Sequence, residues 1–359
     1  MRARDLFTLA SRLADDASAR ESIDSWARSA TPREVLAAGS EARLSFSRGI
    51  WGATFVSLNR PINTTHIVGL PAGALALLTL HRSGYLREVA LEHLTTEGPW
   101  ALPFFLLRCD DIVYSVRARA TETVTTRFVD SHAVAFMRAL RIVATLRMRA
   151  RGGGGPLVKA IESFLVGHAE ALALGDDDPV VRHEAFRLRL RSEPPTLVLC
   201  CALVDPDLRV RIWAARSTLR LASAEDKRSL LPLLEASRSA ATRRLAVCGR
   251  DQLGDDPAIE DALLDVHAAV RLEARLRLRA RQPERPFGQA RTRALSTLSS
   301  GATLPKQLIG ALGALSDVGT HADVAVVESF LEHPIRRVRE EAARTHATLS
   351  VEARERPRA

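Results

Sequence analysis

The chain has 359 residues, of which 51 are basic and 42 acidic, so its formal net charge is +9. This length fits two ordinary domains or one elongated array of repeats. Residues 67–80 form the longest apolar run, but Pro71 interrupts it and it is too short to cross a bilayer, which argues against a membrane-inserted protein.

The four cysteines, Cys109, Cys200, Cys201 and Cys248, show no CxxC spacing and lie in apolar helical contexts. Such cysteines are typical of buried, reduced thiols and not of a disulfide framework. The N-terminal stretch MRARDLFTLASRLADD lacks the continuous apolar segment of a signal peptide. We therefore expect a cytoplasmic protein.

The positive charge allows two interpretations. All but three of the basic residues are arginines, in a chain that is also rich in alanine. An excess of this kind favours acidic partners such as nucleic acid or anionic surfaces. The same composition also arises from codon bias in a GC-rich genome, in which case the charges only solvate the surface.

Residues 1–66 are predicted to form an N-terminal capping segment that is partly helical and partly irregular. Thr31, Pro32 and Glu34 indicate a helix start, with Thr31 as the N-cap and Glu34 reaching back to it as a capping box. The aromatic segment 46–65 contains glycine and asparagine breaks and shows no helical period. We expect it to cover the apolar end of the following array, with docking of a partner as the alternative.

From residue 67 onward, an apolar residue followed by arginine, with alanine three residues later, recurs at a period of roughly 30 residues. A period of this length suits one pair of helices joined by short turns. We call the arginines of this pattern the ladder arginines: Arg87, Arg117, Arg182, Arg211, Arg243, Arg271 and Arg339. An aspartate stands six residues before four of them, at Asp111, Asp176, Asp205 and Asp265.

The aspartate and the arginine are expected to act together in a structural role. In the turn between two helices, the aspartate can cap the second helix and can pair with the arginine one turn inside that helix. Stacked copies would then carry a ladder of such ion pairs, and the small alanines would let neighbouring helices approach closely. Two copies depart from the pattern, because Thr242 precedes Arg243 and because His333 stands where Arg339 would have its aspartate.

Helix pairs are expected throughout residues 67–359, with irregular parts at 131–155 and 282–290. The expected pairs lie near 72–82 and 84–97, 101–109 and 112–128, 156–174 and 178–191, 195–203 and 207–222, 225–236 and 239–252, 257–265 and 267–281, 288–299 and 304–316, and 321–332 and 335–350. Residues 131–151 are expected to be an additional helix or an irregular pair, and QPERPFG at 282–288 is expected to be a loop.

In its turn aspartates, its Val-Arg pairs and the alanines that follow, the chain resembles HEAT-repeat proteins, in the short bacterial form of the phycobilin-lyase-like group. DPDLRVRIWAARSTL, which begins at Asp205, and THADVAVVESFLEHPIRRVREEAARTHATL, near the C-terminus, carry the resemblance best. The family implies an all-α fold, here a right-handed α-solenoid of about eight helix pairs with an irregular N-terminal cap, whose second helices line a concave face. It does not imply one particular function.

Motifs for catalysis or metal binding are incomplete. Gly152–Gly155 precede a helix that contains Lys159, but a P-loop needs a preceding strand and a contiguous Gly-Lys-Ser/Thr. His183 and Glu184 resemble one of the His-Glu pairs of the HEAT-like deoxyhypusine hydroxylases, in which several such pairs hold two irons. A single pair cannot build that centre. We therefore expect no catalytic residue, no metal and no small-molecule cofactor, and we favour a protein that is not an enzyme.

The candidate binding site lies on the second helices of the two central copies, where arginines recur five and nine residues beyond the ladder arginine. Its residues are Arg187, Arg191, Trp213, Arg216 and Arg220. Arginines around an aromatic side chain suit an acidic protein segment with an apolar anchor, or phosphates with stacked bases. A second basic patch, in a stretch of sequence without acidic residues, comprises Arg138, Arg141, Arg147, Arg149 and Arg151.

Two functions remain open at this point. The favoured one is a non-enzymatic adaptor or scaffold that binds a partner protein with an acidic surface on its concave face. The alternative is a nucleic-acid-binding protein with a basic groove, similar to the alkylpurine DNA glycosylases that are built from HEAT-like repeats.

Overall fold

In the computed structural model, residues 5–6, 9, 16–47, 67, 69–149, 154–168, 175–221, 223–284, 286–301 and 304–355 are described. Within these ranges every regular element is a helix, which confirms the predicted all-α class. The contacts divide the chain into two compact units, residues 1–193 and 194–359. In the same ranges, no helix is both long and apolar enough to cross a membrane.

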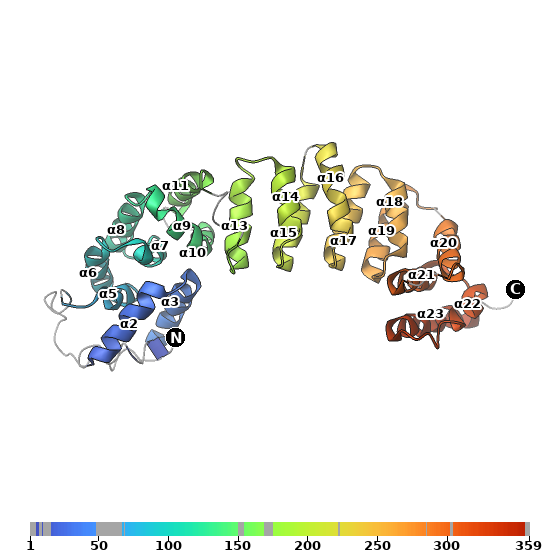
Figure 1. The fold of residues 1–359 in the computed structure, drawn as a ribbon, viewed down its shortest axis with the longest axis horizontal. Coiled ribbons are helices and arrows are strands. Elements are labelled where there is room, and N and C mark those ends of the chain that lie inside the picture. The colour runs from blue at the N-terminus through green and yellow to red at the C-terminus, as the bar shows by residue number, and fades with distance from the viewer. Residues whose placement is uncertain are drawn as a thin grey trace. The chain divides into compact units, whose positions relative to one another are not determined.

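Unit 1 begins with two N-terminal helices and continues with helices that pair with their neighbours along the chain (Figure 1). Its helices are α2 (Ala17–Ser29), α3 (Pro32–Ser47), α5 (Ala72–Leu78), α6 (Gly84–Leu94), α7 (Leu102–Arg108), α8 (Tyr114–Thr125), α9 (Ala133–Arg138), α10 (Leu140–Arg147), α11 (Gly154–Val166) and α13 (Pro179–Arg189), with 3₁₀ turns η2 (Pro99–Ala101) and η3 (Asp130–His132). Ala139 alone separates α9 from α10, so the region expected to be irregular contains two short helices without a loop between them.

The N-terminal helices lie along the first helices of the pairs in unit 1. α2 packs on α5, whereas α3 packs on α7 and α10. Every residue of α7 is buried, and so is every residue of α5 from Gly73 onward. These two helices are apolar on all sides because they are covered on all sides. Most of the aromatic segment 46–65 lies outside the described residues, which resume at residue 67.

The helix start expected at Thr31 is confirmed. The backbone N–H of Thr31 donates to the Glu34 carboxylate at 2.8 Å, and the N–H of Glu34 donates to the Thr31 hydroxyl at 3.3 Å. Pro32 is the first residue of α3, where its lack of an N–H removes no helical hydrogen bond.

Unit 2 is a succession of helix pairs in which first helices and second helices form separate rows (Figure 1). Its helices are α14 (Pro195–Leu203), α15 (Leu208–Leu219), α16 (Ala224–Glu235), α17 (Ala240–Gln252), α18 (Asp256–Asp261), α19 (Ala268–Arg281), α20 (Gly288–Ser299), α21 (Pro305–Val318), α22 (Val324–Glu328) and α23 (Arg336–Glu355), with 3₁₀ turns η4 (Ala262–Leu264) and η5 (His321–Asp323). In the second row α15 packs on α17, and α17 packs on α19. α21 departs from this order, since it packs on η4, α20 and α23.

Each ladder arginine closes the turn that precedes its helix. One Nη of its guanidinium donates to the backbone carbonyl oxygen six residues earlier, at 2.5–2.9 Å in all seven copies. These carbonyl groups belong to His81, Asp111, Asp176, Asp205, Ser237, Asp265 and His333. The bond is independent of the side chain at that position because it uses the backbone alone.

The side chain at the same position fixes the turn from the other side. Its acceptor atom receives the backbone N–H two residues later, at 2.8–3.3 Å in all seven copies. The acceptor is a carboxylate oxygen in the four aspartate copies, the hydroxyl of Ser237 in another, and a ring nitrogen of His81 or His333 in the remaining two. Such local side-chain-to-backbone bonds stabilise turns. His333 therefore takes the place of the aspartate near the C-terminus.

This geometry differs from the predicted pairing of an aspartate and an arginine side chain within one copy. Arg87 and Arg243, for example, reach the aspartate of the following copy instead. Arg87 Nη2 lies 2.7 Å from Asp111, and Arg243 meets Asp265 with Nε and Nη2 at 2.7 and 2.8 Å. The backbone N–H holds the carboxylate inside its own turn, where the arginine of the preceding copy reaches it. The N-cap of the second helix is a different residue, such as Asp207.

Arg243 and Asp265 are expected to stabilise unit 2 as a coupled pair. Both side chains are only 14% exposed, and two hydrogen bonds join them. In a double-mutant cycle with Arg243→Ala and Asp265→Ala, measured by urea unfolding, we expect a coupling energy of about 1–3 kcal/mol. The exposed pair of Arg336 and Glu340 is the control and should show a much smaller coupling. Equal couplings in the two cycles would contradict a structural role for the ladder pair.

Candidate functional site

The five candidate residues belong to different units and have different surroundings. Arg187 lies on α13 and Arg191 follows that helix, in unit 1. Trp213 and Arg216 lie on α15 and Arg220 is its C-cap, in unit 2.

In unit 1, Arg187 and Arg191 belong to a group of ion pairs around two buried glutamates. We call this group the Glu–Arg cluster: Arg147 of α10, Glu162 of α11, Glu184 and Arg187 of α13, and Arg191. Arg147 Nη2 lies 2.8 Å from Glu162 and 2.7 Å from Glu184. Arg187 contacts Glu162 and also lies 2.9 Å from Glu184. Arg191 lies 3.2 Å from Glu162, so carboxylates of the same unit engage both candidate arginines.

The surroundings of Glu184 keep it ionised. Burial opposes ionisation, but hydrogen bonds from His183 and Arg147 and the charge of Arg187 outweigh burial and lower the pKa of Glu184 to about 2. Only 4% of the Glu184 side chain is exposed, so these interactions are weakly screened by solvent. Because the cluster joins α10, α11 and α13, we interpret it as the contact that fixes the irregular α9–α10 region to the next helix pair.

The stability of unit 1 is expected to fall in acid through Glu184. A carboxyl group whose pKa is lowered by folding stabilises the fold above its unfolded-state pKa of about 4.3, and this contribution is lost as the pH falls toward about 2. For Glu184→Gln we expect a loss of roughly 2–3 kcal/mol at neutral pH and a weaker pH dependence of the unfolding free energy below about pH 4.5.

Urea unfolding of both proteins near pH 7 and near pH 3, followed by circular dichroism, measures this difference. Glu193→Gln is the control, because Glu193 pairs with Arg189 within one helical turn and lies outside the cluster. A variant that keeps the full pH dependence of the unsubstituted chain would show that Glu184 does not stabilise the fold in this way.

The second basic patch is basic in sequence but largely paired in space. Its paired arginines are Arg141 with Asp178, Arg149 with Asp110 at 3.6 Å, and Arg147 in the Glu–Arg cluster. Arg138 is exposed and forms no ion pair with the described residues. Arg151 lies outside those residues.

In unit 2, Trp213, Arg216 and Arg220 follow one side of α15, and we call them the α15 face. Trp213 is partly buried, whereas Arg216 and Arg220 are exposed. Among the described parts of the chain, neither of these two arginines forms a hydrogen bond or an ion pair through its guanidinium. The α15 face is therefore the part of the candidate site that keeps unneutralised positive charge.

The residue two positions beyond the ladder arginine explains this difference. In α13 that residue is Glu184, which pairs with Arg187, and in α19 it is Glu273, which pairs with Arg277 at 2.8 Å. In α15 the same position holds Trp213, which has no carboxylate. Arg216 consequently lacks the carboxylate that neutralises its counterpart Arg187.

The sequence analysis missed the acidic partners in both units. Glu162 lies on a first helix, outside the repeating pattern, and contacts arginines 15 to 29 residues away. Glu273 stands at the position equivalent to Glu184, and its partner Arg277 is not part of the candidate site. The one available signal is the recurrence of glutamate at the same position of three second helices, at Glu184, Glu273 and Glu341.

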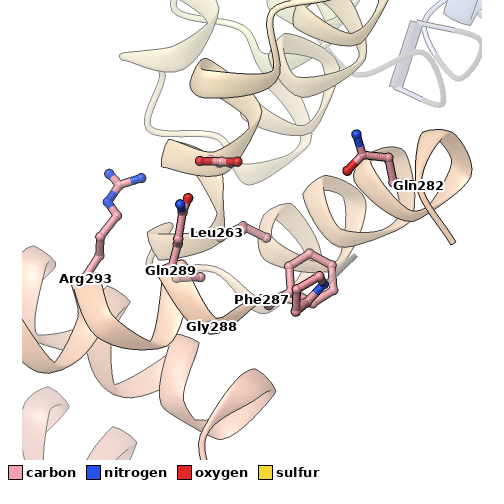
Figure 2. A pocket seen from close by; sticks show the side chains of 9 residues that line it. Leu263, Gln282, Phe287, Gly288, Gln289 and Arg293 are labelled. Atoms are coloured by element: carbon pink, nitrogen blue, oxygen red, sulfur yellow. The ribbon is translucent and has the colours of Figure 1, made fainter. Parts of the chain in front are cut away.

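Unit 2 also contains a pocket of about 410 Å³ beside α18, α19 and α20, shown in Figure 2. Its lining residues are Glu260, Leu263, Gln282, Pro286, Phe287, Gly288, Gln289, Ala290 and Arg293. Arg293 lies 2.6 Å from Asp261, and the guanidinium of Arg279 lies 5.2 Å from the centre of the Phe287 ring.

No protein-family model matches the chain, and no characterised protein matches it in sequence. Among solved structures, an engineered protein is 14% identical over 96% of this chain and 99% of its own, with a TM-score of 0.31. The karyopherin Kap121p, solved with the extreme C-terminus of the protein phosphatase Cdc14p, is 13% identical over 97% of this chain and 46% of its own, with a TM-score of 0.35. At these scores neither structure informs the function of the chain.

Proposed function

We propose that this chain is a non-enzymatic adaptor that binds an acidic segment of a partner protein through the α15 face. In this proposal the helix pairs form a right-handed HEAT-like α-solenoid of about eight pairs, whose second helices supply the binding surface. None of the four cysteines, all of which lie in described parts of the chain, forms a disulfide, which fits the reducing environment of the cytoplasm.

The observation that supports this function best is that α15 has Trp213 at the position where α13 has Glu184. Arg216 stands three residues after Trp213, at the spacing at which Arg187 follows and meets Glu184. A carboxylate from another protein can occupy the corresponding place beside Arg216 and Arg220 and supply the absent charge. An exposed ion pair contributes only about 0.2–1 kcal/mol, so the indole of Trp213 is needed as an apolar anchor for useful affinity.

The α15 face is less suited to nucleic acid. Binding of phosphates is driven by the release of counterions, and two free cations correspond to a salt slope of only about −2. On the following second helices, Asp251 and Glu273 pair with Arg277. No continuous basic track therefore extends from α15 over α17 and α19, which favours a short acidic protein segment.

The test uses fluorescence anisotropy with two labelled probes, a peptide containing four consecutive glutamates and a single-stranded oligonucleotide. We expect the peptide to bind, and Arg216→Glu combined with Arg220→Glu to weaken its binding at least about tenfold through charge repulsion. The matched control, Arg228→Glu with Arg238→Glu, makes the same charge change at two exposed arginines on and beside α16 and should bind normally. Tight oligonucleotide binding with a steep salt dependence would replace this proposal by the nucleic-acid alternative.

A second variant examines the missing glutamate directly. Trp213→Glu keeps both arginines and installs the carboxylate present at this position in α13 and α19. Because this carboxylate competes with the peptide, we expect it to weaken binding several-fold more than Trp213→Gln, which removes the indole without adding charge. An equal loss of peptide affinity in both variants would refute the proposal that a carboxylate at position 213 neutralises the arginines of the α15 face.

A further inference from the structure

Two leucines on α19 lie exposed on the same side of the helix. Leu272 is 49% exposed and Leu276, one helical turn later, is 55% exposed. They stand one and five positions beyond the ladder arginine Arg271. A pair of exposed leucines on one helix face is a feature of interaction surfaces.

The positions of α17 that are equivalent to those of the two leucines contact the next second helix. In α17, Arg244 and Cys248 stand one and five positions beyond the ladder arginine, and both contact the next second helix. Arg244 lies 3.0 Å from Glu273, and the Cys248 sulfur lies 3.5 Å from Glu273 and 3.4 Å from Arg277. Arg244 nevertheless stays 50% exposed, and Arg216, at the second of these positions in α15, is exposed although α17 packs on α15, so these positions lie on the accessible side of the row.

After α19 the next second helix, α21, is placed differently. α21 packs on η4, and it meets Arg271 through Asp317, whose carboxylate lies 2.7 Å from the Nε of Arg271. Glycines permit this approach, because a Cβ at Gly313 would lie 2.4 Å from the Arg271 guanidinium and one at Gly310 would lie 2.0 Å from the Leu264 carbonyl oxygen. Asp317 contacts Arg271 and Arg275, whereas Leu272 and Leu276 follow these arginines by one position, lie on another side of α19 and remain about half exposed.

The surface between the α15 face and the leucines is balanced in charge. On α17 and α19, Arg244 and Arg277 pair with Glu273, and Arg277 also lies 3.3 Å from Asp251. Along the row α15–α17–α19, the exposed surface thus changes from cationic, through charge-balanced, to apolar. This order specifies the chemistry of a ligand that crosses the three helices.

We propose that α15, α17 and α19 bind one extended peptide segment of a partner protein at two points, with acidic residues on Arg216 and Arg220 and an apolar side chain on Leu272 and Leu276. This inference rests on the proposed function of the α15 face. Packed helices lie about 8–10 Å apart, so the two points are separated by roughly 16–20 Å. An extended chain rises about 3.3 Å per residue, so the acidic and apolar residues of the ligand stand about five or six positions apart.

The spacing is tested with labelled peptides that carry two glutamates at one end and two leucines at the other, joined by one, five or twelve Gly/Ser residues and made in both orders. A fourth peptide has glutamates but no leucines. We expect the five-residue spacer to bind at least about tenfold tighter than the one-residue spacer, because only the former spans both points. The twelve-residue spacer should bind with intermediate affinity, since a longer flexible linker lowers the effective concentration only gradually.

The double variant Leu272→Ser and Leu276→Ser should reduce the affinity for the five-residue spacer to that of the peptide without leucines. It should leave binding of that leucine-free peptide unchanged, because the α15 face is intact. The control is Leu197→Ser on α14, where a leucine of similar exposure is replaced away from the second helices. Circular dichroism establishes that the variants retain their helix content.

The outcomes separate this inference from the function on which it rests. Binding that depends on Arg216 and Arg220 but not on the spacer or on the α19 leucines overturns the two-point site and leaves the adaptor function standing. An equal loss in Leu197→Ser also overturns the two-point site. If none of the acidic peptides binds, both proposals are refuted.

Discussion

The hydrogen bond from each ladder arginine to a carbonyl oxygen of the preceding turn is the interaction on which the rest of the structure depends. A guanidinium that is partly or fully buried must find acceptors, and the exposed end of a turn provides carbonyl groups that have no helical partner. The bond therefore satisfies two polar groups at once and sets the angle at which the second helix leaves the turn. Because the acceptor is backbone, the residue that carries it is free to be aspartate, serine or histidine, as at Asp265, Ser237 and His333.

Pairing of arginines with acceptor groups also explains why a net charge of +9 does not produce a uniformly basic surface. Many arginines on the second helices meet a turn carbonyl group or a carboxylate, and burial of the pair strengthens the interaction. In the Glu–Arg cluster, two carboxylates hold three guanidinium groups. Exposed positive charge remains at arginines outside such pairs, such as Arg138 and Arg216, and two residues beyond the ladder arginine of α15 stands Trp213 where α13 has Glu184. The distribution of the positive charge therefore depends on local pairing and cannot be derived from the overall composition.

The sequence predicted the all-α class and the helix pairs because their signals are local. The arginine and its carbonyl partner are six residues apart, and the alternation of turn and helix repeats often enough to be recognised. The Glu–Arg cluster could not be predicted in the same way, since Arg147 and Glu184 are 37 residues apart and lie on different helices. The position of α3 along α7 and α10 was likewise unpredictable, as it depends on which helix faces remain uncovered. For the candidate site, the recurrence of arginines at equivalent positions is visible in the sequence. The ion pairs that neutralise Arg187 and Arg191 are not.

On α19 the ladder arginine has a different second partner from its counterparts in other copies. Arg271 still bonds to the carbonyl oxygen of Asp265, as every ladder arginine does to its own turn, but its second partner is Asp317 on α21 rather than the aspartate of a next regular turn. Small residues on α21 let that helix lie against the turn and the guanidinium, so the polar end of α19 is closed. Asp317 also lies 3.2 Å from Arg275, one turn further along α19, so α21 contacts the side of the helix that carries these two arginines. Leu272 and Leu276 each follow one of the two arginines in the sequence and therefore point to another side of α19, where they remain 49% and 55% exposed.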